Sequence, residues 1–267
     1  MGQEAEPFPA ADTLIRQVVR SQRAAEKRLD SYTFDRRDET TAYRSDGSMK
    51  EVRTRLLYVL GGPGGGSSEL VEVDGRPATE KEKLEVAEKD AKAKKKLEER
   101  AAARAAEKPT VGGDEDDPTI GEHRLSELLR RFDVQVTGRE LVSGRAVWVV
   151  AFAPRSGEPE RGLGERVLGA LAGTAWIDVE DLQVRRGDAH LVRPVRVAGG
   201  LFASVKRGEV TYEAEAAVPG YWFPTRISLR LSGKKALFFQ LEMGYRFDLS
   251  NFRTFAVETE STTGEPK

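Results

Sequence analysis

Hydrophobic positions along the chain recur first with the period of a helix and then with the period of strands. Between Asp12 and Leu29 the aliphatic side chains gather on one face, while arginines and lysines occupy the other. Asp12 is placed to cap the N-terminus, and Pro9 stands shortly before it. This pattern predicts an amphipathic helix that lies on an apolar surface.

From Tyr32 onward the hydrophobic period becomes two, as in strands with one buried and one wet face. The clearest case is Ile227, Leu229 and Leu231, which alternate with polar residues. Glycine-containing turns, including Ser232-Gly233, are expected to separate the strands. The expected strands cover residues 32–43, 49–60, 69–73, 132–141, 145–153, 174–179, 183–195, 204–218, 222–231, 236–247 and 252–258. We therefore expect about ten or eleven strands, most of them antiparallel.

Two capping boxes mark the starts of further helices. The first, at Thr79 and Glu82, opens a strongly charged helix with a thin apolar stripe. The second, at Thr119 and Glu122, opens a short helix with leucines on one side. Another short helix is expected over residues 164–171. Together these helices supply the elements that can cover an apolar sheet face.

The elements together predict a mainly β (α+β) fold, a half-open curved antiparallel β-barrel with amphipathic lid helices over its concave face. Residues 12–258 are expected to form this single domain. Within it, residues 79–107 are a charged helical insertion and residues 108–118 an acidic linker. The ends, residues 1–11 and 259–267, are expected to be disordered.

Composition narrows the classes of function. With 43 basic and 44 acidic residues, the chain lacks the basic footprint of a nucleic-acid-binding domain. It has no cysteine and two histidines, which argues against zinc ribbons, thiol nucleophiles and histidine-rich metal sites. No apolar run approaches the length of a membrane-spanning helix. We expect no cofactor, no metal, no nucleic acid and no membrane span.

Short segments that suggest catalysis lack the residues that their chemistry needs. Gly61 to Ser68 is rich in glycine, but Ser67 stands where a phosphate-binding loop has its lysine. Ser232 to Lys235 matches the S-x-x-K of penicillin-binding enzymes without their companion motifs, and a hairpin turn is expected there. Acidic clusters such as residues 178–181 are expected to be solvated surface. A hydrolase with two catalytic carboxylates is therefore the least supported hypothesis.

A set of aromatic and aliphatic residues on the strands forms the candidate ligand-binding surface. Each has two interpretations, ordinary core or the lining of a pocket for an apolar ligand, because such pockets are concave and mainly apolar. The pattern alone does not separate the two for any one residue. The set comprises Phe34, Leu57, Val59, Trp148, Val150, Phe152, Trp176, Tyr212, Ile227, Leu229, Phe238 and Leu241.

The order of the elements and several short segments carry a family resemblance. The segments are Tyr32-Thr33-Phe34, Asp133 to Glu140 (DVQVTGRE), Gly144 to Pro154 (GRAVWVVAFAP), Gly173 to Asp178 (GTAWID) and Trp222 to Ile227 (WFPTRI). With them the chain resembles the bacterial outer-membrane lipoprotein-sorting (LolA/LolB-like) superfamily, which is related to RseB and to mycobacterial lipid carriers. The W-I-D and W-x-P-T-R-I segments are the most telling, and the likeness covers residues 13–255.

This resemblance implies a non-catalytic carrier or binding protein that takes up lipid or lipoprotein acyl chains in an apolar cavity. It implies a periplasmic or outer-membrane-associated protein whose signal sequence is absent from the chain. The alternative is a protein-binding regulatory or scaffolding module of the same fold in the cell envelope. In that case an envelope protein is the partner, and the charged helix over residues 79–107 is the surface that it contacts.

Overall fold

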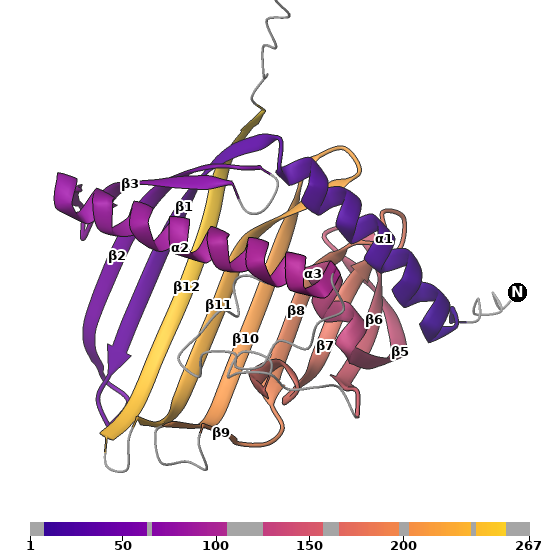
Figure 1. Ribbon diagram of the computed structural model, residues 1–267. Helices are drawn as coiled ribbons and strands as arrows, with labels where there is room; N and C mark the ends of the chain where they lie inside the picture. The colour runs from indigo at the N-terminus through magenta and orange to yellow at the C-terminus, as the bar shows by residue number, and fades with distance from the viewer. Residues whose placement is uncertain are drawn as a thin grey trace, which may run out of the picture.

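One antiparallel sheet makes up most of the protein, and helices lie along one of its faces (Figure 1). The computed structural model describes residues 8–62, 66–105, 125–156, 166–197, 203–235 and 239–254. Its helices are α1 (Ala11–Leu29), α2 (Glu80–Ala105), α3 (Leu125–Leu128) and the 3-10 turn η3 (Leu129–Arg131). Its strands are β1 (Tyr32–Tyr43), β2 (Met49–Leu60), β3 (Ser67–Val73), β4 (Arg76–Pro77), β5 (Phe132–Val142), β6 (Arg145–Pro154), β7 (Leu171–Asp178), β8 (Val184–Leu191), β9 (Val195–Val197), β10 (Ala203–Val218), β11 (Tyr221–Lys235) and β12 (Phe239–Thr254). The expected linker 108–118, the expected disordered C-terminus 259–267 and residues 1–7 of the expected disordered N-terminus 1–11 lie outside the described residues, whereas residue 11 begins α1.

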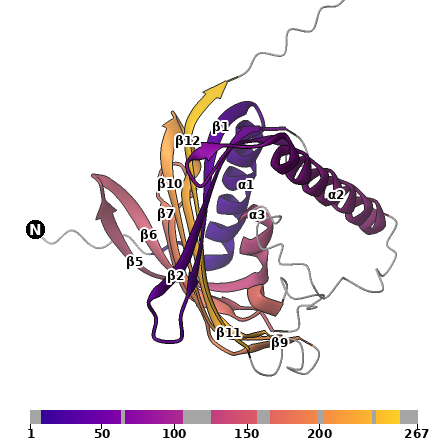
Figure 2. The same cartoon turned by 90° about the vertical axis from the view of Figure 1, so that its left-hand side faces the viewer.

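The sheet is open at both edges. Its strand order is β4-β3-β2-β1-β12-β11-β10-β8-β7-β6-β5, and β9 pairs with β10 beside this path. The first long strand, β1, pairs with the last, β12, so segments from opposite ends of the sequence lie side by side inside the sheet. The edge strands β4 and β5 do not pair with each other, and Figure 2 shows a curved sheet with the helices on its concave side. The predicted curved, half-open antiparallel fold is confirmed, with twelve strands.

Helix α1 covers one part of the concave face because its apolar stripe is continuous. Leu14 and Val18 are buried in one cluster with Trp148 and Val150 of β6 and Ile177 of β7. Leu14 and Val18 are four residues apart, so their side chains lie on the same side of the helix. The amphipathic helix predicted from the sequence is therefore confirmed, and its apolar face lies against the strands β6 and β7.

Polar contacts fix both ends of α1. The helix begins at Ala11, so Asp12, expected as the cap, lies in the first turn, where a negative charge still favours the helix N-terminus. Near the other end, the Glu26 carboxylate accepts hydrogen bonds from the Ser126 amide at 2.9 Å and the Ser126 hydroxyl at 2.6 Å. This carboxylate satisfies a donor at the start of α3 and ties the two helices together.

Helix α2 is fixed to the sheet at its N-terminal end. The predicted capping box is present: the Glu82 amide donates to Thr79 Oγ1 at 3.3 Å, and the Thr79 amide donates to the Glu82 carboxylate at 2.9 Å. Arg76 donates twice to the same carboxylate, at 2.7 and 3.0 Å. Val86 is buried in a cluster with Phe34, and Asp90 one turn later accepts a hydrogen bond from the Ser68 hydroxyl of β3. The C-terminal part of the helix extends away from the sheet (Figure 2).

The sequence misplaces some strand ends, each for an identifiable reason. Ser232-Gly233 is not a turn, because β11 continues to Lys235. A Cβ at Gly233 would collide with the Ser204 carbonyl, so this glycine permits a close approach of two strands. The expected strand over residues 183–195 is divided into β8 and β9 at Pro194, which lacks the N–H that a ladder requires.

Replacing Leu14 by alanine is expected to lower the free energy of unfolding by about 3 kcal/mol, because the change removes buried methyl groups and leaves a cavity under α1. The matched control is Leu84→Ala on α2, where the side chain is 63% exposed. Its expected effect is within about 0.5 kcal/mol. Urea unfolding followed by circular dichroism compares the two, and equal losses would contradict the placement of α1.

The capping box predicts an acid-sensitive start of α2. Hydrogen bonds from Arg76 and then from Thr79 lower the pKa of Glu82 to about 2. A carboxylate with a lowered folded-state pKa stabilises the fold above its ordinary pKa, and this contribution is lost as the pH falls from about 4.5 to about 2. Protection of the Glu82 and Lys83 amides in hydrogen exchange should fall over this interval. Glu82→Gln should show the weaker protection already at pH 7, whereas Glu80→Gln should match the parent protein.

Candidate functional site

The strand register shows which side chains share the concave face. Residues directly opposite each other in an antiparallel pair point to the same face, so a row can be followed from strand to strand. One row, from β2 to β5, is Arg55, Asp38, Phe247, Ile227, Tyr212, Gly187, Ala175, Val150 and Val136. The next row is Arg53, Thr40, Tyr245, Leu229, Val210, Ala189, Gly173, Phe152 and Val134. Because Val150 packs against α1, both rows lie on the helix side of the sheet.

Five apolar side chains in the middle of this face remain partly exposed. They are Ile227, Leu229, Met243, Tyr245 and Phe247, here called the apolar strip, and they lie on β11 and β12. None of them belongs to the hydrophobic clusters that involve α1 or α2. The strip is therefore an apolar surface that the described helices leave incompletely covered.

Beyond β10, small residues of β7 and β8 continue the two rows toward β6. Gly187 and Ala189 of β8, with Gly173 and Ala175 of β7, continue the two rows beyond β10. An added Cβ at Gly187 would have one neighbouring heavy atom within 4 Å, the Tyr212 Cβ at 3.8 Å. On β7 and β8 the side chains of these two rows are therefore small.

Tyr212 borders the apolar strip on β10 and adds no charge to it. Its Cα partners are Ile227 on one side and Gly187 on the other. Burial raises the pKa of its phenol, and the negative charge of Glu26 raises this pKa further. The phenol consequently stays protonated throughout the neutral range.

The ligand-binding residues proposed from the sequence fall into several groups. Those within a hydrophobic cluster or packed against one are Phe34, Leu57, Val59, Trp148, Val150, Phe152 and Tyr212. Ile227 and Leu229 belong to the apolar strip. Phe238 lies outside the described residues, and Leu241 is placed in β12 by its backbone alone. The fold thus brings Ile227, Leu229 and Tyr212 together.

Trp176 lies on the opposite, convex face. Its Cα partners are Val149 and Arg186, which belong to the alternate set of positions on their strands. The indole Nε1 donates to Glu140 at 3.2 Å, and the Arg186 guanidinium lies 4.9 Å from the ring centre. Trp176 is therefore separated from the other candidates by the thickness of the sheet.

Three residues of the apolar strip were missed in the sequence. Met243, Tyr245 and Phe247 alternate with polar or small residues in the segment 242–248. This alternation is the signal that could have found them, since it marks one face of a strand. Their pairing with β11 places all three beside Ile227, Leu229 and Leu231.

The two segments most telling for the family resemblance meet at one corner of the sheet. Asp178, the last residue of the W-I-D segment, is fully buried and accepts hydrogen bonds from Arg145 Nε and Nη2, both at 2.8 Å. Arg145 also donates to Asp181 at 2.7 Å, and Asp181 accepts from the Trp222 indole at 2.9 Å. These contacts join β6, β7 and β11. The W-I-D and W-x-P-T-R-I segments therefore hold neighbouring parts of the sheet together.

Hydrogen bonding keeps Asp178 ionised at this corner. Burial by itself raises the pKa of the carboxyl, but the hydrogen bonds from Arg145 and from the Asp181 and Glu180 amides outweigh it. The pKa of Asp178 therefore lies below its ordinary value. Arg185, which lies 4.3 Å from the Trp222 ring centre, adds a second positive charge. The buried charge is thus compensated on several sides.

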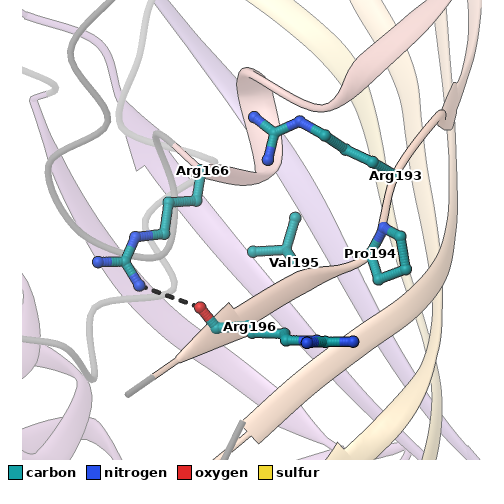
Figure 3. A pocket seen from close by; sticks show the side chains of 5 residues that line it. All are labelled: Arg166, Arg193, Pro194, Val195 and Arg196. Carbon is teal, nitrogen blue, oxygen red and sulfur yellow. Dashed lines mark hydrogen bonds between the residues drawn. The ribbon is translucent and has the colours of Figure 1, made fainter. Parts of the chain in front are cut away.

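A hollow of about 370 Å³ opens beside β9, away from the apolar strip (Figure 3). Two of its arginines are held by carbonyl groups: Arg166 Nη1 donates to the Arg196 carbonyl at 3.0 Å, and Arg193 Nη2 donates to the Gly169 carbonyl at 3.0 Å. The residues that line it are Arg166, Arg193, Pro194, Val195 and Arg196. This basic lining does not suit an acyl chain.

In the part of the chain that the structure describes, no helix is both long enough and apolar enough to cross a membrane.

Comparisons with known proteins find similar folds among solved structures. No protein-family model matches the chain, and no curated protein matches its sequence. An outer membrane lipoprotein-sorting protein domain from Vibrio parahaemolyticus is 10% identical, with a TM-score of 0.42, over 96% of this chain and 95% of that one. A LolA superfamily protein from Nitrosomonas europaea is 12% identical, with a TM-score of 0.36, over 94% and 96%. The MucA/MucB complex of Pseudomonas aeruginosa is 12% identical, with a TM-score of 0.22, over 92% and 99%. Two of these solved structures carry the name of the superfamily that the sequence resembles.

Removing the buried carboxylate at the corner should destabilise the protein. We expect Asp178→Ala to lower the free energy of unfolding by about 3 kcal/mol, because it leaves Arg145 and Arg185 without their buried counter-charge. Glu180→Ala is the control, since its side chain is 79% exposed. Chemical unfolding of both variants is the measurement. A small effect at Asp178 would show that the corner does not hold β6, β7 and β11 together.

Proposed function

We propose that this protein is a non-catalytic carrier or binding protein that holds the acyl chain of a lipid or lipoprotein on its concave face. The observation that carries the proposal is the apolar strip, an apolar surface in the middle of a curved sheet that no described helix packs into a core cluster. Large exposed apolar patches on soluble proteins mark binding sites. The family resemblance of the sequence points to the same class of protein.

The energetics suit reversible binding. Moving a chain from water to an apolar surface contributes about 0.8 kcal/mol for each fully buried CH2 group. A long chain that lies along the strip and stays covered on one side gains several kcal/mol in this way. Such a complex is stable in water but still releases its chain to a more apolar acceptor.

Helix α2 is the element best placed to admit and cover the chain. It is held at its start by Arg76, Glu82 and Val86, and its main contacts with the sheet are made to β3. Helix α1, in contrast, is buried along its stripe over β6 and β7. Movement of α2 about its anchored end would bring it over a chain bound on the strip, while the core under α1 remains intact.

We place this function in the periplasm or at the outer membrane, the compartment that the family resemblance implies. A protein-binding regulatory module is the second candidate, and exposed Leu84 on the strongly charged α2 favours it. Deleting residues 91–105, which follow the part of α2 anchored to the sheet, separates the two. A carrier retains acyl-chain binding, whereas a module that recruits an envelope protein through α2 loses that partner.

A pair of neighbouring residues on β11 tests the acyl-chain site. Leu229 belongs to the apolar strip and Ser228 points to the opposite face, so Leu229→Glu and Ser228→Glu add the same charge on different sides. We expect the first to weaken binding of a fluorescent fatty acid roughly tenfold or more, equivalent to at least about 1.4 kcal/mol, and the second to leave it unchanged.

A third variant distinguishes loss of binding from loss of the folded structure. Leu229→Trp keeps the position apolar but fills the space above it, so it should lower the amount of bound chain while the circular dichroism spectrum stays unchanged. Titration of the fluorescent fatty acid, with native mass spectrometry for stoichiometry, is the measurement. Unchanged binding in both Leu229 variants would sink the proposed site.

A further inference from the structure

A charged cluster lies on the concave face at one end of the apolar strip. The buried Asp38 carboxylate accepts hydrogen bonds from Arg36 Nε at 2.8 Å and Arg36 Nη2 at 3.2 Å. Arg55 Nη2 approaches the same carboxylate at 3.4 Å. The side chain of Asp38 is 5% exposed, whereas those of Arg36 and Arg55 are 36% and 44% exposed. We call these three residues the Asp38 cluster.

The register joins this cluster directly to the apolar strip. Asp38 lies between Arg55 of β2 and Phe247 of β12, and Phe247 lies opposite Ile227. Arg36, one position along the same face, lies between Leu57 and Leu249. The two guanidinium groups therefore lie beside the apolar strip on one side and beside Arg53 and Thr40 of the next row on another.

The Asp38 cluster carries more positive than negative charge. Two guanidinium groups share one carboxylate, which leaves a formal charge of +1 on this part of the concave face. Within the described residues, Nε and Nη1 of Arg55 donate to no acceptor. On the convex face, by comparison, a single arginine can contact two acids: Arg226 lies 2.7 Å from Asp248 and 3.5 Å from Glu213.

Resting on the acyl-chain binding proposed above, we propose that Arg36 and Arg55 bind the anionic head group of an amphiphile whose chain lies along the apolar strip. Arginine is suited to this task because its planar guanidinium is weakly hydrated and donates in pairs to carboxylate and phosphate oxygens. Asp38 is a positioning residue, because its buried carboxylate holds both guanidinium groups at the edge of the strip.

The dimensions of the row agree with such a ligand. From Arg55 to Tyr212 it crosses four strand spacings, which is about 19 Å. One lipid chain spans about 15 Å, half of the hydrocarbon thickness of a bilayer. A head group at Arg55 therefore leaves its chain over Phe247 and Ile227, ending toward Tyr212 at the edge of the cluster under α1.

Three ligands that share a chain and differ in head group test this assignment. Palmitate and palmitoyl lysophosphatidic acid are anionic, whereas monopalmitoylglycerol is uncharged. We expect the parent protein to bind the anionic ligands roughly tenfold more tightly than the uncharged one, a difference typical of charge-assisted hydrogen bonds. Isothermal titration calorimetry measures all three, and the tighter of the two anions shows whether carboxylate or phosphate is the preferred head group.

Three variants test which arginines cause the preference for anionic over uncharged ligands. Arg55→Gln and Arg36→Gln should each reduce it without changing the affinity for monopalmitoylglycerol. Arg37→Gln is the matched control, because Arg37 neighbours Arg36 and Asp38 in sequence but points to the convex face. It should leave all three affinities unchanged.

Asp38→Asn supplies an independent readout. Asparagine has the same shape and keeps one acceptor oxygen for the guanidinium groups, but it removes the negative charge that competes with the ligand. The preference for palmitate over monopalmitoylglycerol should therefore increase. A cluster with a merely structural role would lose stability with no change in this preference, which would overturn the assignment. Equal affinities of the parent protein for charged and uncharged ligands would overturn it as well. Absence of binding by all three ligands would instead contradict the proposed function.

Discussion

A curved sheet that does not close has an apolar face that another part of the molecule must cover, and this requirement governs the rest of the structure. Helix α1 meets it over β6 and β7, where Leu14 and Val18 are buried. Helix α2 meets it at its first turns, through Val86. Between these two regions lies the apolar strip on β11 and β12. The candidate site follows from this incomplete cover.

The division of charge between the two faces supports this view. The convex face carries ion pairs across neighbouring strands, such as Arg226 with Asp248 and Arg246 with Glu39. The concave face has the Asp38 cluster beside apolar residues. A water-facing sheet surface and a ligand-facing one therefore have different chemistry on alternate residues of the same strands.

Sequence patterns predicted elements well where one local signal decides the structure. The stripe of α1 and the capping box of α2 are short-range patterns, and both are confirmed. Features that depend on neighbouring strands were not accessible in this way. Gly233 looked like a turn residue, although it permits the close approach of β10 and β11. Trp176 was grouped with Trp148, although register places the two on opposite faces.

The site was predictable only in part for the same reason. Ile227 and Leu229 were selected from their alternation, but the fold adds Met243, Tyr245 and Phe247 because β12 pairs with β11 in one register. The distinctive W-I-D and W-x-P-T-R-I segments belong to the Asp178 corner, outside the candidate site. Local sequence distinctiveness and ligand contact are therefore separate properties in this protein.

Photo-crosslinking with a diazirine-bearing palmitate tests the central claim most directly, because the label reports where the chain lies. We expect the label to map by mass spectrometry to peptides of β11 and β12 that contain the apolar strip, and to be displaced by unlabelled palmitate. Label confined to the arginine-lined hollow beside β9, or spread without displacement over the convex face, would contradict the account.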